Sequence, residues 1–291
     1  MTVRTRDGRS LHVERFGEGT PIVVFESGMG VSRAEWGAVV PAVATRTSAV
    51  VYDRSGLGRS PVDPQPRTLD RLASDLLDVL DDLGDGPFVL VGHSWGGPII
   101  RVAASRLAPA RLAGLVLVDV TDERCDLFFE SASERQARLS RAVMPLLART
   151  GLLRIPVKRM ARSLPEPWAT AMRTEDMTLA ATRTQLAELA GHIDDLRRLH
   201  DEPLVLPDVP VTVISGEKRG FMERNRRPEL LRAHAATAAS FPQGRHVLAP
   251  ASSHYVPLTD APLVVDEVLR IVDAARQSST PGSDRSFGSA G

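Results

Sequence analysis

The chain has a single cysteine, Cys125, among its 291 residues, so no intrachain disulfide can form. That scarcity fits a reducing compartment. No run approaches the ~18 apolar residues that a membrane-spanning helix needs. The first 19 residues lack the apolar core of a signal peptide and instead alternate polar and apolar side chains. We therefore expect a cytoplasmic protein with no membrane partner.

Excess charge of either sign is also missing, because Lys+Arg and Asp+Glu both total 36. A net charge of zero provides no global field that would attract nucleic acid. The sequence contains no H-E-x-x-H motif, and one cysteine excludes a C-x-x-C site. A P-loop and a G-x-G-x-x-G motif after a strand are absent too. We expect no nucleic acid partner, no metal and no cofactor; the oligomeric state is not predicted.

What is present is a series of strand-like segments. Thr2–Arg6 and Leu11–Phe16 flank an Asp7-Gly8 turn, which is a strong hairpin signal. Five continuous apolar runs follow, of the kind typical of strands buried on both faces of a parallel sheet. They are Pro21–Phe25, Ser48–Tyr52, Phe88–Val91, Leu115–Val118 and Val211–Ile214.

Helical patterns lie between these runs. Leucines recur at helical spacing from Leu69 to Leu83, with Thr68 as the predicted N-cap and Gly84 as the stop. Another apolar face begins near Pro262. Strands that alternate with helices indicate βαβ units, so we predict an α/β fold with a mostly parallel sheet.

The alternation stops between residues 122 and 207. That region has no convincing strand, is rich in Arg, Ala and Leu, and has prolines at positions 145, 156, 165, 167 and 203. We predict a cap of several short helices there, inserted into a core formed by residues 1–121 and 208–276. The Ser/Gly/Pro-rich tail 277–291 is predicted to be disordered.

The sharpest local signal is the sequence Gly92-His93-Ser94-Trp95-Gly96. It matches G-x-S-x-G, follows an apolar run and precedes a helix-compatible segment. So short a motif also arises by chance, but this context favours a strained turn that lifts a nucleophilic serine above the sheet edge. Glycines flank the serine because a side chain there would collide with the turn.

A serine hydroxyl is a weak nucleophile and needs a base. Seven histidines are candidates: His12, His93, His192, His200, His234, His246 and His254. His254 follows an apolar run in a loop just before the final helix, and catalytic groups gather in loops after parallel strands. We predict that His254 is the base; the alternative is a solvated loop histidine.

Three motifs in this order resemble the α/β-hydrolase superfamily. Besides the serine turn, Asp53–Ser60 looks like the family's D-x-x-G-x-G-x-S loop, and Ser253–Leu258 looks like its G-H loop. The resemblance implies the α/β-hydrolase fold: an eight-stranded, mostly parallel sheet with an antiparallel second strand and flanking helices. It also implies an inserted helical cap.

The segment Phe25–Gly30 resembles the family's oxyanion loop, although the more usual His-Gly is absent. The resemblance implies an oxyanion hole formed by the backbone N–H groups of Met29 and Trp95. The departure leaves that role intact because it needs no side chain. Trp95 is also expected to line the acyl pocket.

The third member of the triad is ambiguous. The family often supplies an acid as G-x-x-D after the seventh strand, but Arg219 stands at that position. Some members draw the acid from the end of the sixth strand, where Asp119 follows an apolar run. We prefer Asp119, with Glu217 and Asp122 as alternatives; Asp119 could also simply cap the next helix.

The resulting hypothesis is a cofactor-free serine hydrolase acting on a small apolar ester or related acyl compound. Ser94 would attack, His254 would transfer protons, and Asp119 would hold His254. A serine at position 94 argues against the family's epoxide hydrolases and haloalkane dehalogenases, which use aspartate. The rival hypotheses are a non-catalytic binding protein, a cofactor-free perhydrolase and an acyltransferase.

Overall fold

The computed structural model describes residues 1–176, 178–219 and 226–279. Eight strands form one sheet in the order β1-β2-β4-β3-β5-β6-β7-β8. Strand β2 is antiparallel to both of its neighbours and the other pairs are parallel, which confirms the predicted sheet. The strands are β1 Thr2–Arg4, β2 Ser10–Phe16, β3 Ile22–Glu26, β4 Ala49–Tyr52, β5 Phe88–His93, β6 Leu112–Val118, β7 Val211–Gly216 and β8 Gly244–Ala249.

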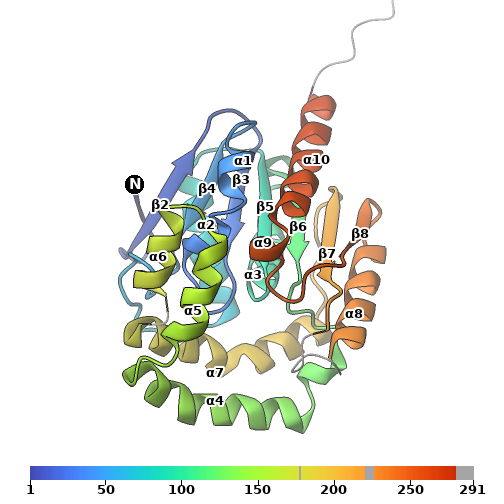
Figure 1. Ribbon diagram of the computed structural model, residues 1–291. Coiled ribbons are helices and arrows are strands. Elements are labelled where there is room, and N and C mark those ends of the chain that lie inside the picture. Colours follow the sequence, from blue (N-terminus) through green and yellow to red (C-terminus); the bar gives the residue numbers. More distant parts are fainter. Residues whose placement is uncertain (177, 220–225, 280–291) are drawn as a thin grey trace, which may run out of the picture.

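Helices cover both faces of the sheet (Figure 1). One core cluster joins α2 (Leu69–Asp82) and α3 (Gly96–Ala104) to one face, where α8 (Arg227–Ala239) also packs. A second joins α1 (Val40–Val43) and α10 (Ala261–Ser279) to the other face. Short elements complete the core: α9 Val256–Thr259 and the 3₁₀ turns η1 Arg33–Trp36 and η2 Pro109–Arg111.

The alternation of side chains along β3 explains this two-faced core. Val23 and Phe25 belong to one apolar cluster and Val24 belongs to the other, all of them buried. A period of two places successive side chains on opposite faces, and continuous apolar runs therefore suit a sheet covered on both sides. The predicted N-cap of α2 is also present, since the Thr68 hydroxyl accepts from Arg71 N–H at 3.3 Å.

Helices α4 to α7 lie between β6 and β7, and we call this helical part of residues 122–207 the cap. It comprises α4 Ser131–Arg149, α5 Arg154–Met160, α6 Trp168–Glu175 and α7 Leu179–Asp201, with turns η3 Asp126–Phe128 and η4 Ala161–Ser163. Figure 1 shows α4 and α7 packed along each other at one end of the sheet. No strand occurs among the cap residues that the structure describes.

Two predictions about helix length were wrong. The cap was predicted to hold only short helices, yet α4 has 19 residues and α7 has 23. Pro145 lies inside α4, so this proline does not end the helix. The predicted tail began at residue 277, but α10 continues to Ser279. The rest of that tail, residues 280–291, lies outside the described residues.

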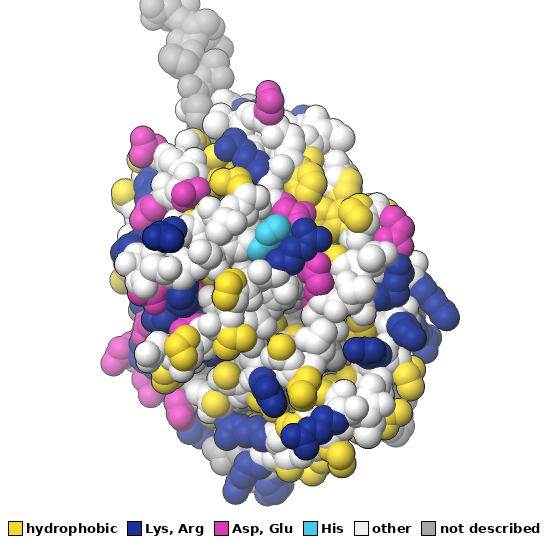
Figure 2. Space-filling model, turned by 90° about the vertical axis from the view of Figure 1, so that its left-hand side faces the viewer, with side chains coloured by type: hydrophobic (Ala, Val, Ile, Leu, Met, Phe, Trp, Pro, Cys, Tyr) yellow, Lys and Arg dark blue, Asp and Glu magenta, His cyan; other side chains and the backbone are white. Residues whose placement is uncertain are grey.

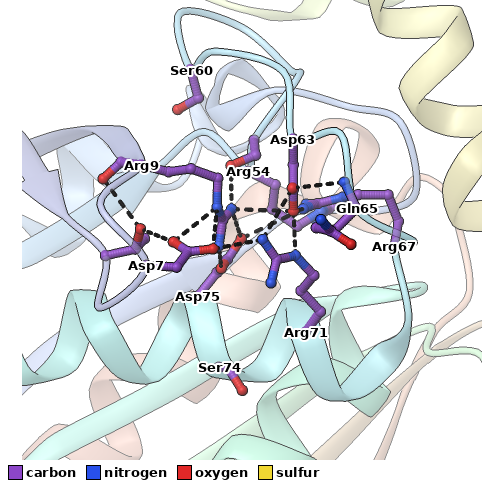
Figure 3. A network of polar contacts seen from close by, with 12 residues as sticks. Asp7, Arg9, Arg54, Ser60, Asp63, Gln65, Arg67, Arg71, Ser74 and Asp75 are labelled. Carbon is purple, nitrogen blue, oxygen red and sulfur yellow. Dashed lines mark hydrogen bonds and ion pairs between the residues drawn. The ribbon is translucent and has the colours of Figure 1, made fainter.

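A network of charges ties the N-terminal hairpin to α2 (Figure 3). Arg9 donates to both oxygens of the buried Asp75, at 2.9 and 2.5 Å. Asp63, also buried, accepts from Arg67 at 2.9 Å and from Arg71. Buried carboxylates paired in this way fix the hairpin against α2 without exposing uncompensated charge.

Leu76 tests the packing of α2 on the sheet, because its side chain is fully buried in the core. Replacing Leu76 with Ala removes buried methyl groups and leaves a cavity, which should lower the free energy of unfolding by about 2–5 kcal/mol. The control is Leu146→Ala in α4, where the leucine is 62% exposed. Urea unfolding followed by circular dichroism should show little change for the control, and equal effects in both variants would contradict the described packing.

Candidate active site

Ser94 occupies the sharp turn between β5 and α3. Its backbone φ is +51°, a conformation that residues other than glycine seldom adopt. A Cβ at Gly92 would lie 2.6 Å from the carbonyl oxygen of Gly96, and one at Gly96 would lie 2.4 Å from that of Glu26. Both positions therefore require glycine, and the turn holds a half-buried serine above the strand end.

Asp119 follows β6 and also has a positive φ, of +42°. Its carboxylate is buried, and one oxygen, Oδ2, lies 2.8 Å from His254 Nδ1. The other, Oδ1, accepts from Gly216 N–H at 2.9 Å and from the Arg227 guanidinium at 2.6 Å. Burial acts to raise the pKa of Asp119, but the bond to His254 and the nearby positive charges hold it well below its usual range. The carboxylate is therefore ionised.

Ser94, Asp119 and His254 line the same cavity, of about 400 Å³. Three separate loops at the carboxyl ends of β5, β6 and β8 bring them there. Apolar and polar groups complete the wall: Val120, Thr121, Cys125, Leu127, Phe128, Gln136, Arg226, Arg227 and Leu230.

The two alternative acids lie elsewhere. Glu217 is exposed, at the end of β7. Asp122 is buried, but its carboxylate accepts from Thr237 Oγ1 at 2.6 Å and from Arg124 N–H at 2.9 Å. Its contacts tie α8 to the loop after β6, so Asp119 is the predicted acid that the structure places beside His254.

The cavity corrects the expectation about Trp95. Trp95 was expected to line the acyl pocket, but its ring is buried away from the cavity and packs edge-on against His192. From the cap, Phe128 does line the cavity, whereas Leu146 and Leu152 are exposed. The sequence showed that these side chains were apolar but not where each would lie.

The predicted oxyanion donors follow β3 and β5, which are parallel neighbours, so their loops lie at the same edge of the sheet. Met29 is half-buried in the loop after β3, and Trp95 follows Ser94 at the start of α3. Within the described residues, neither backbone N–H donates to another protein group. Two such N–H groups can donate hydrogen bonds to an oxygen on which negative charge develops.

A second carboxylate–imidazole pair lies beside the first, and no motif in the sequence indicates it. His93 Nδ1 lies 2.8 Å from Glu35 Oε1, and His93 Nε2 lies 2.8 Å from the carbonyl oxygen of His254. A carbonyl can only accept, so Nε2 carries a proton, and Glu35 favours another on Nδ1. Burial acts to lower the pKa of His93, yet Glu35 raises it above its ordinary value. Burial likewise acts to raise the pKa of Glu35, and His93 holds it below its usual range.

Glu35 also connects this pair to the oxyanion loop, because its Oε2 accepts from Gly28 N–H at 2.8 Å. From the other side, the buried Arg54 donates to the carbonyl oxygens of Ser27 and Gly28, both at 2.7 Å. Glu188 of cap helix α7 accepts from Arg54 Nε at 2.9 Å and from Gly30 N–H at 3.1 Å. Buried charges of both signs therefore hold the loop that carries Met29.

The described residues contain no group of three or more His, Cys, Asp or Glu side chains placed to bind a metal ion. None of the helices that the structure describes is long and apolar enough to cross a membrane. A separate hollow of about 560 Å³ along α2 shares no lining residue with the cavity that Ser94 lines, and is lined by the paired charges of the N-terminal network, including Asp7, Arg9 and Asp75. It holds no histidine that could act as a base at neutral pH.

Glu35→Gln tests the buried pair. The variant keeps the shape, and a neutral His93 can still donate to the His254 carbonyl while accepting from the amide. The ion pair contributes stability above the unfolded pKa of Glu, about 4.3, and below the unfolded pKa of His, about 6.5. This contribution is lost as pH rises through the raised pKa of folded His93.

The free energies of unfolding of the wild type and Glu35→Gln, measured in urea, should therefore differ most at about pH 5.5, and the difference should shrink as pH rises through the raised pKa of His93. Asp266→Asn, a surface carboxylate in α10, provides the control and should show no such trend. If the difference in the free energy of unfolding between wild type and Glu35→Gln does not change with pH, Glu35 and His93 do not form an ion pair.

Sequence comparisons show which known proteins this chain is similar to. Residues 23–268 match the model of the alpha/beta hydrolase family. A relative from Azorhizobium caulinodans, named "Putative carbamate hydrolase RutD", is 35% identical over 135 residues, which are 46% of this chain and 50% of that protein. A protein of the same name from Pseudomonas savastanoi pv. phaseolicola is 27% identical over 245 residues, covering 82% of this chain and 89% of the relative.

The chain spans about half the length of the first curated relatives that it matches. Among solved structures, an esterase from Thermogutta terrifontis superposes with a TM-score of 0.70 at 24% identity, covering 94% of this chain and 98% of the other. The likeness to that structure supports the fold alone. Because the family model matches most of the sequence, from the first parallel strand to the last helix, the chain belongs to the alpha/beta hydrolase family.

Proposed function

We propose that the protein is a serine hydrolase that cleaves a carboxylic ester or a related acyl compound. The observation that carries the proposal is the cavity that Ser94 and His254 share, with the His254 ring held by a buried, ionised Asp119. A nucleophile, a base and a group that orients the base are the parts that acyl transfer requires.

In the first step, Ser94 Oγ attacks the substrate carbonyl while His254 Nε2 takes the hydroxyl proton. The Asp119 carboxylate keeps a proton on Nδ1, which leaves Nε2 free to act as the base. The carbonyl oxygen gains negative charge, and the N–H groups of Met29 and Trp95 would stabilise it; losing one such donor typically costs about 10²–10³ in kcat.

The tetrahedral intermediate then collapses, and His254 delivers its proton to the leaving group. Water enters, His254 removes its proton, and attack on the acyl-enzyme releases the acid and restores Ser94. No redox chemistry is required in this cycle. The apolar wall of Val120, Leu127 and Phe128 suits an apolar acyl group, whereas Gln136 and Arg226 suit a polar end.

The comparisons support the same chemistry. The relatives are named as carbamate hydrolases, and a carbamate is also cleaved at an acyl carbon. The binding-protein hypothesis was based on the missing carboxylate after the seventh strand. Asp119 beside His254 removes that basis, so hydrolysis is the function that the geometry supports best.

The activated nucleophile can be tested with a fluorophosphonate, which reacts with serines that have a functioning base. Intact mass spectrometry of the wild type should show one adduct, and Ser94→Ala should show none. Ser252→Ala is the matched control, because Ser252 lies in the histidine loop but not among the residues that line the cavity, and its hydroxyl accepts a hydrogen bond from Thr259. If folded wild-type protein stays unlabelled, or if Ser94→Ala is labelled equally, the proposal fails.

The acid can be tested separately by comparing Asp119→Asn with Glu217→Gln on an ester that the wild type hydrolyses. Asp119→Asn should lower kcat by about 10⁴-fold, because the amide no longer selects the tautomer of His254. Glu217→Gln changes an exposed side chain and should leave kcat within twofold of wild type, an order-of-magnitude expectation for surface changes. The opposite ranking would move the acid to the end of β7.

A further inference from the structure

One segment of the cap concentrates positive charge, although residues 122–207 as a whole contain 13 basic and 13 acidic side chains. Residues 135–165 contain eight basic side chains and no Asp or Glu. All eight are exposed: Arg135, Arg138, Arg141, Arg149, Arg154, Lys158, Arg159 and Arg162. The remainder of the chain must therefore carry a net charge of −8. The positive charge is therefore concentrated in one segment of the chain.

These cations also differ from the arginines of the core. Arg33 and Arg54, for example, each pair with two or more buried or half-buried carboxylates. Among the described side chains, none of the eight cap cations pairs with a carboxylate. Arg141 instead donates to the carbonyl oxygens of Leu189 and Ala190. Arg135 donates to Ser131 Oγ at 3.1 Å, so neither of these two contacts neutralises the positive charge.

Large apolar side chains are exposed on the same surface. Leu139, Val143 and Leu146 are 64%, 38% and 62% exposed, and their spacing of four and three residues places them on one side of α4. Leu152 and Ile155 continue the apolar surface around the start of α5, at 51% and 65%. Half of the ten large apolar side chains that are exposed in the described chain thus lie within 17 consecutive residues. Figure 2 shows dark blue and yellow side chains mixed at the lower end of the molecule, where the cap lies.

We infer that this surface, residues 135–162, docks the protein on an anionic lipid surface. Exposed apolar side chains flanked by cations are the pattern of helices that lie in the plane of a membrane interface. The negative potential of an anionic lipid surface attracts and stabilises cations, and the apolar side chains enter the boundary between headgroups and acyl chains. A polyanion such as nucleic acid would engage the cations but gain little from the leucines.

Docking of this kind does not require a spanning helix, and none is described here. The inference changes the expectation of no membrane partner in one respect: the protein would contact a membrane surface without spanning it. The surface begins at the rim of the catalytic cavity, since Gln136 of α4 lines that cavity. Docking would therefore bring the cavity mouth close to amphiphilic molecules. Binding can be measured without turnover, so the inference stands or falls separately from the proposed hydrolysis.

The test is sedimentation of the full chain with vesicles of phosphatidylglycerol and phosphatidylcholine, compared with vesicles of phosphatidylcholine alone. We expect binding to the anionic vesicles only, and we expect it to weaken as NaCl rises from about 0.05 to about 0.5 M. No binding to anionic vesicles at low salt would overturn the inference. Equal binding to both kinds of vesicle would overturn its electrostatic part and with it the proposed docking.

Two sets of substitutions test the two kinds of side chain. The charge set should weaken binding about tenfold or more, and the apolar set should weaken it even at low salt. The charge set is Arg138→Gln, Arg149→Gln and Arg154→Gln, and the apolar set is Leu139→Ser, Leu146→Ser and Ile155→Ser.

Matched controls use exposed side chains outside the surface and should bind like the wild type. They are Arg4→Gln, Arg124→Gln and Arg183→Gln for charge, and Val62→Ser and Val205→Ser for the apolar side chains. If controls and test variants lose binding equally, net charge alone acts and the surface is not the docking site. If only the charge set matters and duplex DNA competes fully, the partner is a polyanion and the lipid inference is wrong.

Discussion

The contact on which the site depends is the buried carboxylate of Asp119 and the three groups that it holds. It fixes the ring of His254 through Nδ1, and it accepts from the backbone of β7 and from Arg227 at the start of α8. A lone buried carboxylate would take up a proton, but this one stays ionised because its neighbours are positive or donate hydrogen bonds. These contacts compensate for the strained backbone at Asp119, which has a positive φ, and so hold the loop after β6 in this conformation.

Ionised pairs also connect the serine turn, the loop after β3 and the cap. Glu35 joins the serine turn to the oxyanion loop through His93 and Gly28, and Arg54 joins that loop to Glu188 of the cap. Such pairs contribute little to stability beyond what apolar residues would contribute, and their value lies in directing each loop to one position. The cap is therefore connected to the reaction site, since Glu188 and the loop beside Ser94 share one buried arginine.

Periodicity and motifs predicted the sheet, the helices on it, and the residues Ser94 and His254, because each of these signals is local in the sequence. Asp119 remained one of three candidates, since the choice depends on which strand end lies nearest His254. Glu35 and Arg227 could not be predicted: their partners are 58 and 108 residues away, and no spacing rule connects them. The cap helices were predicted too short in a region that contains several prolines, whereas α4 continues through Pro145 and packs along α7.

The crystal structure of the phosphonate adduct would test the central claim most directly, because it reports every part of the site together. The account predicts phosphorus bonded to Ser94 Oγ and an oxygen within hydrogen-bonding distance of both Met29 N and Trp95 N. It also predicts that His254 stays on Asp119, with Nε2 facing the adduct. An adduct whose oxygen points to solvent, or a His254 ring that has left Asp119, would contradict the account.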